Sequence, residues 1–346
     1  MKTLSFFSIC LFLSLTLTAQ KVITVDNRLN TGPDVPNVHY SSLSDAVGVA
    51  IVGDTIQIHP SATAYGNVTV NKRLILVGLS HNPDNSKVGE KATVGLIYFT
   101  GQSANSLVTG LQISGITNTG TLTDLTGIKI TNNRISSYIS VPSNAALNGW
   151  TVEGNIFTNA YVNLGTLTNN WMIKNNIFDQ TTQYPIHSCN DQTSFLNNLI
   201  VSSSGNFANN CTDTIVSNNI FILEGSITDV KLNGSTIVYS NNLTRNTSGF
   251  TVTSLSGSGN LDNTDPGFSF AFADIADYYN NDYNVSGPAV GAGTDGTDLG
   301  VYGAMFNFDP QGRPDLWPYM TSLDISNPSV PMGQNINVTF TAGKKN

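Results

Sequence analysis

Charged residues are scarce in this 346-residue chain. Asp, Glu, Lys and Arg make up 11% of the sequence, which is less than half of the about 25% typical of soluble domains. Asn, Thr, Ser and Gly take their place, a composition that argues against long solvent-exposed helices and favours β-structure with many polar turns. The net charge of −8 with only five arginines also excludes nucleic acid as an expected partner, because phosphate contacts need Lys and Arg.

Long hydrophobic runs are also missing after the N-terminus. The one clear run lies between Leu4 and Leu17, behind Lys2 and before the small residue Ala19, which is the arrangement of a secretory signal peptide. This run is too short for a comfortable membrane span, and no later stretch approaches about 20 apolar residues. We therefore expect cleavage after Ala19, no membrane span, and a secreted or cell-surface protein.

Asparagine is abundant in the middle of the chain, in pairs that recur at a nearly fixed spacing. The second residues of the pairs lie 22, 21, 22, 21 and 23 positions apart, and they are Asn133, Asn155, Asn176, Asn198, Asn219 and Asn242. A period of this length indicates stacked supersecondary units. Asn or Gly at the first position of each pair tolerates the left-handed backbone of a tight corner. The second Asn can donate and accept hydrogen bonds along the stack, so we predict a structural Asn ladder.

Apolar residues keep their place relative to these pairs from one repeat to the next. Three positions before the second Asn stand Ile130, Val152, Ile173, Phe195, Val216 and Tyr239. One position after it stand Ile156, Ile177, Leu199, Ile220 and Leu243, with Arg134 as the one exception. We predict that both columns line the interior of a solenoid, as stacked repeats require. Two positions before the Asn, Glu153 and Lys174 should meet on the surface.

The periodic pattern divides the chain into five parts. After the signal peptide (1–19) we predict a lead-in with a capping helix that begins after Ser42 (20–62). About nine coils of about 22 residues follow (63–262). The pattern stops near Asn260, so we expect a C-terminal cap over the last coil (263–315). The tail (316–346) should contain two short β-strands, Ser322–Ile325 and Asn335–Phe340.

The block from Tyr40 to Gly78 resembles the opening of the right-handed parallel β-helix family, the pectin-lyase-like fold, and the segment after Asn260 resembles the closing segment of bacterial secreted β-helix proteins. The matching stretches are Leu43-Ser44-Asp45-Ala46-Val47, Gly53-Asp54-Thr55-Ile56-Gln57-Ile58, Val68-Thr69-Val70-Asn71-Lys72 and Leu74-Ile75-Leu76-Val77-Gly78. The chain departs from the family at Pro60-Ser61, where Pro-Gly is common. The resemblance implies an all-β, single-stranded right-handed parallel β-helix. It does not select an activity, because this fold hosts lyases, hydrolases, esterases, epimerases, adhesins and inert fibres.

Catalytic candidates are few. In the family, the resemblance implies, lyases hold calcium with clustered acids and use a Lys or Arg base, whereas hydrolases use two or three close carboxylates. Acids between residues 100 and 260 all stand singly in this chain. Asp191 and Asp213, one repeat apart with His187 nearby, are the best catalytic or calcium candidates, and turn residues are the alternative. Asp295 and Asp298 are candidate calcium ligands in a Gly- and Thr-rich loop, where turn chemistry is the alternative.

Two cysteines remain after the predicted cleavage. Cys189 and Cys211 are 22 residues apart, hence in equivalent places of adjacent coils and about 4.8 Å from each other. In an oxidising compartment we predict a disulfide between them, with stacked free thiols as the alternative. One nearby histidine does not complete a zinc site.

Aromatic residues offer a non-catalytic function. Trp150 and Trp171 are one repeat apart and would form a sugar-stacking platform if both faced outward, whereas one or both could instead fill the core. Tyr161 and Tyr184 could stack on sugars as well. The first hypothesis is therefore a secreted, non-catalytic β-helix that binds carbohydrate or a cell-surface glycan. The alternative is a lyase or glycoside hydrolase acting on a plant or algal type polysaccharide, with calcium as a candidate cofactor.

Overall fold

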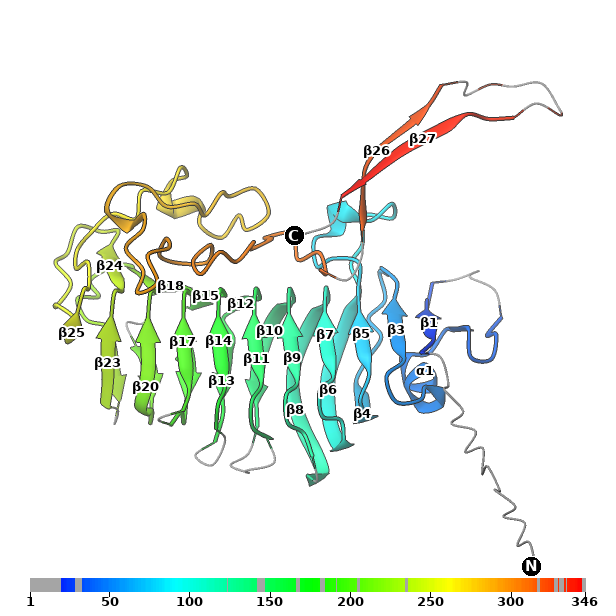
Figure 1. Cartoon of the computed structure of the whole chain (residues 1–346), viewed down its shortest axis with the longest axis horizontal. Helices are drawn as coiled ribbons and strands as arrows, with labels where there is room; N and C mark the ends of the chain where they lie inside the picture. Colours follow the sequence, from blue (N-terminus) through cyan, green and yellow to red (C-terminus); the bar gives the residue numbers. More distant parts are fainter. Residues whose placement is uncertain are drawn as a thin grey trace, which may run out of the picture.

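The structure is a computed structural model of the whole chain. It describes residues 20–28, 33–122, 124–141, 147–165, 169–180, 184–190, 192–203, 206–233, 236–315, 318–326, 329, 333 and 335–343. The predicted signal peptide and Asp191 lie outside these residues. The fold is an all-β parallel solenoid of about eight turns, and Figure 1 shows its strands stacked side by side as the rungs of a rod.

One sheet of twelve strands forms one side of the rod. Its central strands are very short, because each coil turns at an Asn or Gly corner directly after them. In spatial order the strands are β2 (His39–Tyr40), β1 (Val22–Val25), β3 (Thr55–Ile58), β5 (Ile75–Val77), β7 (Leu107–Thr109), β9 (Lys129–Thr131), β11 (Thr151–Glu153), β14 (Met172–Lys174), β17 (Ser194–Leu196), β20 (Thr212–Ser217), β23 (Thr236–Ser240) and β25 (Gly257–Ser258).

In the second sheet each early coil contributes one long strand, and each later coil contributes two short strands. The undivided strands are β4 (Val68–Lys72), β6 (Thr93–Gln102), β8 (Gln112–Leu122) and β10 (Arg134–Ser140). From β10 onward each coil contributes two short strands. We call the first set the covered row: β12 (Ile156–Thr158), β15 (Ile177–Gln180), β18 (Leu199–Ser202), β21 (Ile220–Leu223) and β24 (Leu243–Asn246). The second set is the open row: β13 (Tyr161–Asn163), β16 (Ile186–His187), β19 (Asn206–Asn209) and β22 (Lys231–Asn233).

A helix is present where the sequence predicted one, as α1 (Leu43–Val49). Its first turn begins at Ser42, whose hydroxyl accepts a hydrogen bond from the Asp45 amide at 3.2 Å. Leu43, Ala46 and Val47 are buried on one face. The number of coils was overestimated by one, because the early coils are longer than the Asn spacing: Val68 pairs with Ile97, which is 29 residues later.

The Asn ladder is confirmed. The second Asn of each pair is buried, and its Nδ2 donates to Oδ1 of the next one along the rod at 3.0–3.3 Å, as far as Asn260. The same Oδ1 also accepts the backbone N–H of the Asn in the preceding coil, at 2.9 Å from Asn155 to Asn176. The first Asn of each pair has a positive φ, for example +53° at Asn175, and Gly154 takes this place with +68°. Each corner therefore uses one residue for the turn and one for the ladder.

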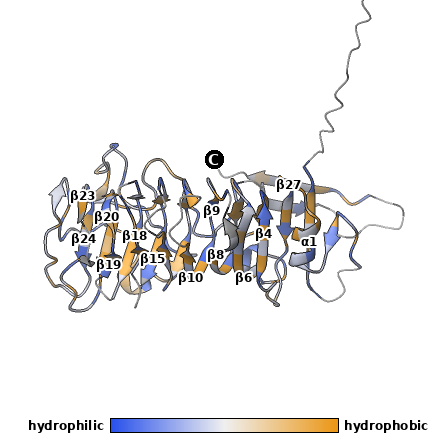
Figure 2. Cartoon of the chain, turned by 90° about the horizontal axis from the view of Figure 1, so that it is seen from below, coloured by the Kyte–Doolittle hydropathy of each residue, from blue (hydrophilic) through white to orange (hydrophobic). Residues whose placement is uncertain are grey.

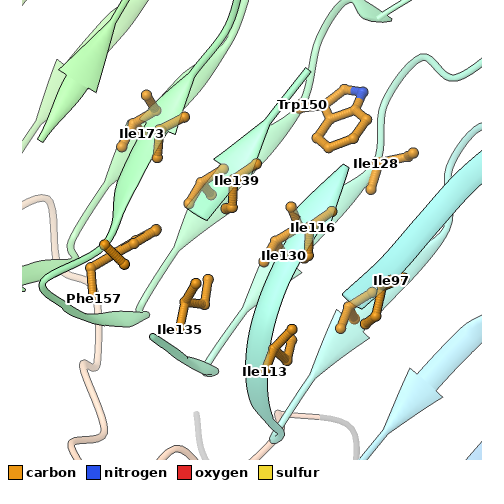
Figure 3. Close-up of a cluster of buried hydrophobic side chains, with 14 of the residues drawn as sticks. Ile97, Ile113, Ile116, Ile128, Ile130, Ile135, Ile139, Trp150, Phe157 and Ile173 are labelled. Carbon is orange, nitrogen blue, oxygen red and sulfur yellow. The ribbon is translucent and has the colours of Figure 1, made fainter. Parts of the chain in front are cut away.

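The interior of the rod is apolar along its length. The column three residues before the ladder Asn is buried in the core, as predicted, and so is the column two residues after it, which includes Ile135, Phe157 and Phe178. Figure 3 shows Ile130, Ile135, Phe157 and Ile173 among the packed side chains of this core. In Figure 2 hydrophobic stretches lie within the strands along the rod.

The second predicted interior column lies on the outside instead. Ile156, Ile177, Leu199, Ile220 and Leu243 belong to a separate buried cluster with residues of the C-terminal segment, among them Ile275, Tyr283 and Phe308. The left-handed corner interrupts the strand alternation, so the residue directly after the ladder Asn points away from the core and the following residue points into it. These side chains are buried only because another segment covers them.

That covering segment is residues 263–315, which we call the strap. It includes the 3₁₀ turns η3 (Phe272–Asp274) and η4 (Gly287–Ala289). We predicted a cap over the last coil, but the strap runs back along the outside of the rod toward its N-terminal half (Figure 1). Asn175 Nδ2 donates to the carbonyls of Val301 and Gly303 at 3.1 and 3.0 Å. Farther along, Gln311 meets the loop that contains η1 (Pro83–Asn85).

The tail forms a separate antiparallel hairpin of β26 (Tyr319–Ile325) and β27 (Val338–Gly343). Both strands were predicted, with slightly different ends. In Figure 1 this hairpin projects away from the rod. It adds no strand to either sheet of the solenoid.

Candidate functional site

A group of partly exposed aromatic side chains follows the outer surface from β10 into the open row. Tyr138 and Tyr161 are direct partners on adjacent strands, and their ring centroids are 6.0 Å apart. The imidazole of His187 lies 4.9 Å from the Tyr161 ring and 5.2 Å from the Tyr184 ring. We call Tyr138, Tyr161, Tyr184 and His187 the aromatic strip.

The backbone on either side keeps the strip in place. Val162 and Ile186, the strand neighbours of Tyr161 and His187, are buried in the core, so the strip residues must point outward. In the preceding coil Gly115 is the partner of Tyr138. A Cβ at Gly115 would lie 3.3 Å from the Tyr138 ring and 2.9 Å from its carbonyl oxygen, so a side chain there would displace the ring. Glycine therefore leaves the space that Tyr138 occupies.

A column of polar residues passes through His187 of the strip. Ser140, Asn163, His187 and Asn209 are successive partners on adjacent strands. Desolvation by burial lowers the pKa of His187, and a hydrogen bond with the Tyr184 backbone opposes this shift. His187 is therefore neutral at pH 7, and its Nε2 atom is buried without a hydrogen-bond partner among the described residues. Neutral hydroxyl, amide and imidazole groups beside aromatic rings suit hydrogen bonding and stacking on an uncharged polar ligand.

The two tryptophans do not form the predicted surface platform. Trp150 and Trp171 are 0% and 1% exposed, and their rings stack at 4.6 Å inside the core. Each indole Nε1 donates to a backbone carbonyl at 2.6 Å, of Leu125 and Leu147 respectively. Each Trp stands two residues before a core residue, Val152 or Ile173, and strand alternation turns both inward. The prediction that they are adjacent is confirmed, and their sugar-binding role is wrong.

The acid–base candidates remain unassembled in the described residues. Asp191 lies outside them. Asp213 is exposed in a β-bulge of β20 with a φ of +53°, whereas His187 belongs to the other sheet. Glu153 and Lys174 do meet one coil apart, as predicted, with Oε1 and Nζ 2.8 Å apart. Both side chains are partly exposed, and such pairs between neighbouring strands stabilise a surface by a few tenths of a kcal/mol to about 1 kcal/mol.

Asp295 and Asp298 serve as turn residues. Oδ1 of Asp295 accepts hydrogen bonds from the amide and hydroxyl of Thr297 at 3.1 and 2.7 Å, and the hydroxyl bond is the main reason that the pKa of Asp295 is lowered. Oδ1 of Asp298 accepts the Gly291 amide at 2.9 Å. In the part of the chain that the structure describes, no three His, Cys, Asp or Glu side chains gather into a group that could hold a metal. Asp295 and Asp298 thus take the turn roles that the sequence offered as the alternative to calcium binding.

The predicted disulfide is not formed. Cys189 and Cys211 lie in adjacent coils, as the spacing predicted, but both are free buried thiols. Each Sγ donates to the carbonyl two residues earlier in its own coil, to His187 at 3.6 Å and to Asn209 at 3.7 Å. Burial raises the pKa of the Cys189 thiol well above its ordinary value. The backbone N–H of Cys189 also donates to Sγ of Cys211 at 3.4 Å, so the two cysteines are hydrogen-bonded between adjacent coils as well.

Comparisons with known proteins leave the family open. No protein-family model matches the chain, and no curated protein matches it significantly. None of the described helices is long and apolar enough to cross a membrane.

The sequence contained a signal for the aromatic strip that the first interpretation used only in part. Tyr161 and Tyr184 were named as sugar-stacking candidates, but Tyr138 was missed. The three tyrosines are 23 residues apart in each step, close to the coil length. A search for aromatic residues at the coil period would have found them.

Proposed function

We propose that this chain is a secreted, non-catalytic β-helix protein that binds a neutral polysaccharide or cell-surface glycan along the aromatic strip. The observation that carries the proposal is the strip itself: Tyr138, Tyr161, Tyr184 and His187 are in ring contact on the outer surface of successive coils. The apolar run before Ala19 supports export. The resemblance of residues Tyr40 to Gly78 to the opening of the pectin-lyase-like fold, and of the segment after Asn260 to the closing segment of bacterial secreted β-helix proteins, is consistent with this proposal.

A repeating surface is suited to a repeating ligand. Outward residues recur at about 4.8 Å along the rod, so the strip presents several similar contacts in a line. Aromatic faces stack on the apolar faces of sugars, and neighbouring amides such as Asn163 and Asn209 can bond sugar hydroxyls. The neutral imidazole of His187 adds a partly exposed ring to the strip without adding charge.

The experiment is a calorimetric titration of the chain without residues 1–19 against neutral polysaccharides. We expect binding by at least one neutral glycan, and a loss of about 10-fold in affinity for Tyr161→Ala, which corresponds to about 1.4 kcal/mol. Phe250→Ala is the matched control, since Phe250 is an exposed aromatic residue that follows a turn and lies outside the strip. Equal affinities of Tyr161→Ala and the parent chain would disprove binding at the strip.

The enzymatic alternative is tested with the same panel. New unsaturated ends would indicate a lyase, and new reducing ends would indicate a hydrolase. Either product, formed by the parent chain and not by heat-denatured protein, would overturn the non-catalytic part of the proposal.

A further inference from the structure

The strap is attached to the rod in two different ways. In its middle, corner Asn residues bind its backbone: Asn241 Nδ2 donates to the carbonyl of Ala292 at 2.8 Å, and the Gly300 amide donates to the carbonyl of Asn218 at 2.9 Å. Residues 263–315 contribute no strand to either sheet of the solenoid, so no strand ladder holds the strap. The orange end of the strap in Figure 1 lies beside the cyan loop that contains η1.

Polar contacts fasten this end of the strap to the η1 loop, and we call them the latch. The side-chain oxygen of Gln311 accepts hydrogen bonds from the amides of Asn82 and Asn85, and its carbonyl accepts one from the Ser80 hydroxyl. Nε2 of Gln311 donates to the Tyr279 carbonyl at 2.6 Å. Two separate turns of the strap therefore meet at the same short loop.

His81 lies in the middle of the latch, and its side chain is 0% exposed. Gly312 packs against the imidazole, where any Cβ would collide with the ring. The Tyr279 hydroxyl donates to the His81 carbonyl at 2.9 Å and lies 3.4 Å from Nδ1. Nε2 has no hydrogen-bond partner among the described residues. A protonated imidazole carries an N–H on both nitrogens, so the closed latch has no acceptor for the second of them.

The two charges that act on the His81 imidazole are both positive. They belong to Arg134, at the start of β10, and to Lys91, just before β6. Burial has the larger effect, and burial and the two cations together lower the pKa of His81 to about 3, while a backbone hydrogen bond opposes them. The strap itself fixes Arg134 in place. Its Nη1 donates to the Tyr279 hydroxyl at 3.3 Å, and its guanidinium carbon lies 5.4 Å from the centre of the Tyr278 ring.

The carboxylates near the latch do not offset these cations at His81. Asp309 of the strap is engaged by Arg313, with Oδ2 and Nε 2.6 Å apart. Glu90 acts on the lysine that follows it, and Asp84, on the same loop as His81, is exposed. None of these three carboxylates contributes to the pKa shift of His81. A proton on the closed latch therefore meets burial and like charge, and these acids do not act as its counter-ion.

We propose that His81 makes the latch acid-sensitive, so that its protonation releases this end of the strap while the rod stays folded. Opening returns the imidazole to water, where its ordinary pKa is about 6.5. Because the pKa in the closed latch is lower, the latch is complete above about pH 6.5, and opening becomes about tenfold more favourable for each pH unit below it. The Asn ladder consists of amides that do not titrate in this range, so the rod should remain intact.

Hydrogen exchange of the full chain, followed by mass spectrometry and corrected for intrinsic rates, tests the latch. Protection of the segments around Tyr279 and Gly312 should fall about 100-fold from pH 7.5 to pH 4.5, because the open latch takes up one proton. The middle of the strap around Gly300 and the strand around Ile177 should keep their protection. This pattern would show local release of one end of the strap.

Three variants show whether His81 is the group that titrates. His81→Gln cannot take up the proton, so the protection of its latch should not depend on pH. The slope decides and not the level, since poorer packing of Gln lowers protection equally at every pH. Gln311→Ala keeps His81 but loses the latch bonds, so its protection should be lower at pH 7.5 and should keep the parent slope. His187→Gln, in the aromatic strip, is the matched control and should reproduce the parent curve.

Two results in particular would overturn the latch. The first is constant protection of the latch down to pH 4.5 in the parent chain, and the second is the parent's slope in His81→Gln. Loss of protection at the latch and at β15 in the same pH range would show that acid unfolds the whole rod, which also contradicts the proposal. These outcomes are independent of glycan binding at the aromatic strip, which the Tyr161→Ala titration tests separately.

Discussion

The covered row and the open row are built from the same coils, yet the outer surface of the first is buried and that of the second is partly exposed. In the covered row the outward column consists of three Ile and two Leu residues, and the chain's own strap buries it. In the open row the outward positions hold Tyr, Asn and His, which remain partly exposed. Burying apolar area stabilises by about 25 cal/mol per Å², so an apolar outer column requires a cover. The open row has no such apolar column, so its outer surface needs no cover and is accessible to a ligand.

Removing one member of the Asn ladder should have the largest effect, because both rows depend on it. The side chain of Asn176 donates to Val152, Lys174 and Asn198 and accepts two bonds from Asn155. Asn176→Ala leaves several buried groups unpaired, at about 1–3 kcal/mol each. We expect the free energy of unfolding to fall by roughly 3–5 kcal/mol in guanidinium titrations. Asn284→Ala, at an exposed turn, should change it by under about 1 kcal/mol, and equal effects would contradict a structural ladder.

The Asn ladder also shows which features of the fold could be predicted from the sequence alone. The period of the pairs predicted the stack, the corners, and the adjacency of Glu153 and Lys174, because each depends only on counting residues per coil. The period led to a wrong prediction for Ile177 and its equivalents, which were expected to line the core. A left-handed corner precedes them and changes the side to which the next residue points. Strand alternation from Val152 would have placed Trp150 inside. The strap contacts of Arg134 join residues more than 140 positions apart, and no local pattern encodes such a pairing.

The next prediction compares the two rows directly. Ile177 is fully buried between the covered row and the strap, so Ile177→Ala should cost about 3 kcal/mol through lost burial and a cavity. Tyr161→Ala in the open row should cost about 1 kcal/mol, mostly its aromatic contacts. Ile177→Ala should also speed proteolytic cleavage within residues 263–315, whereas Tyr161→Ala should not. A larger loss for Tyr161→Ala would reverse the distinction between the rows.

The pH dependence of stability should differ between variants of His81, the histidine under the strap, and variants of His187, the histidine in the strip. The folded-state pKa of His81, about 3, lies below its unfolded value, so the unfolded chain binds the proton first. Neutral His81 makes its full contribution to the free energy of unfolding above about pH 6.5. This contribution falls by about 1.4 kcal/mol for each pH unit below that value. His81→Gln should flatten the stability curve between about pH 6.5 and 4.5 more than His187→Gln, because His187 is only partly buried. Equal curves for both variants would contradict the burial of His81 under the strap.

The smallest effect is expected from a reducing agent, which tests the thiols beneath the open row. Cys189 and Cys211 are thiols with no disulfide between them, so dithiothreitol should leave the free energy of unfolding unchanged. A disulfide across these 22 positions would instead add about 3 kcal/mol, because it would restrict the unfolded chain. A thiol reagent should label neither cysteine in the native state and both in guanidinium. Absence of labelling in guanidinium before reduction, together with a stability loss after it, would show that Cys189 and Cys211 form the disulfide that the coil spacing first suggested.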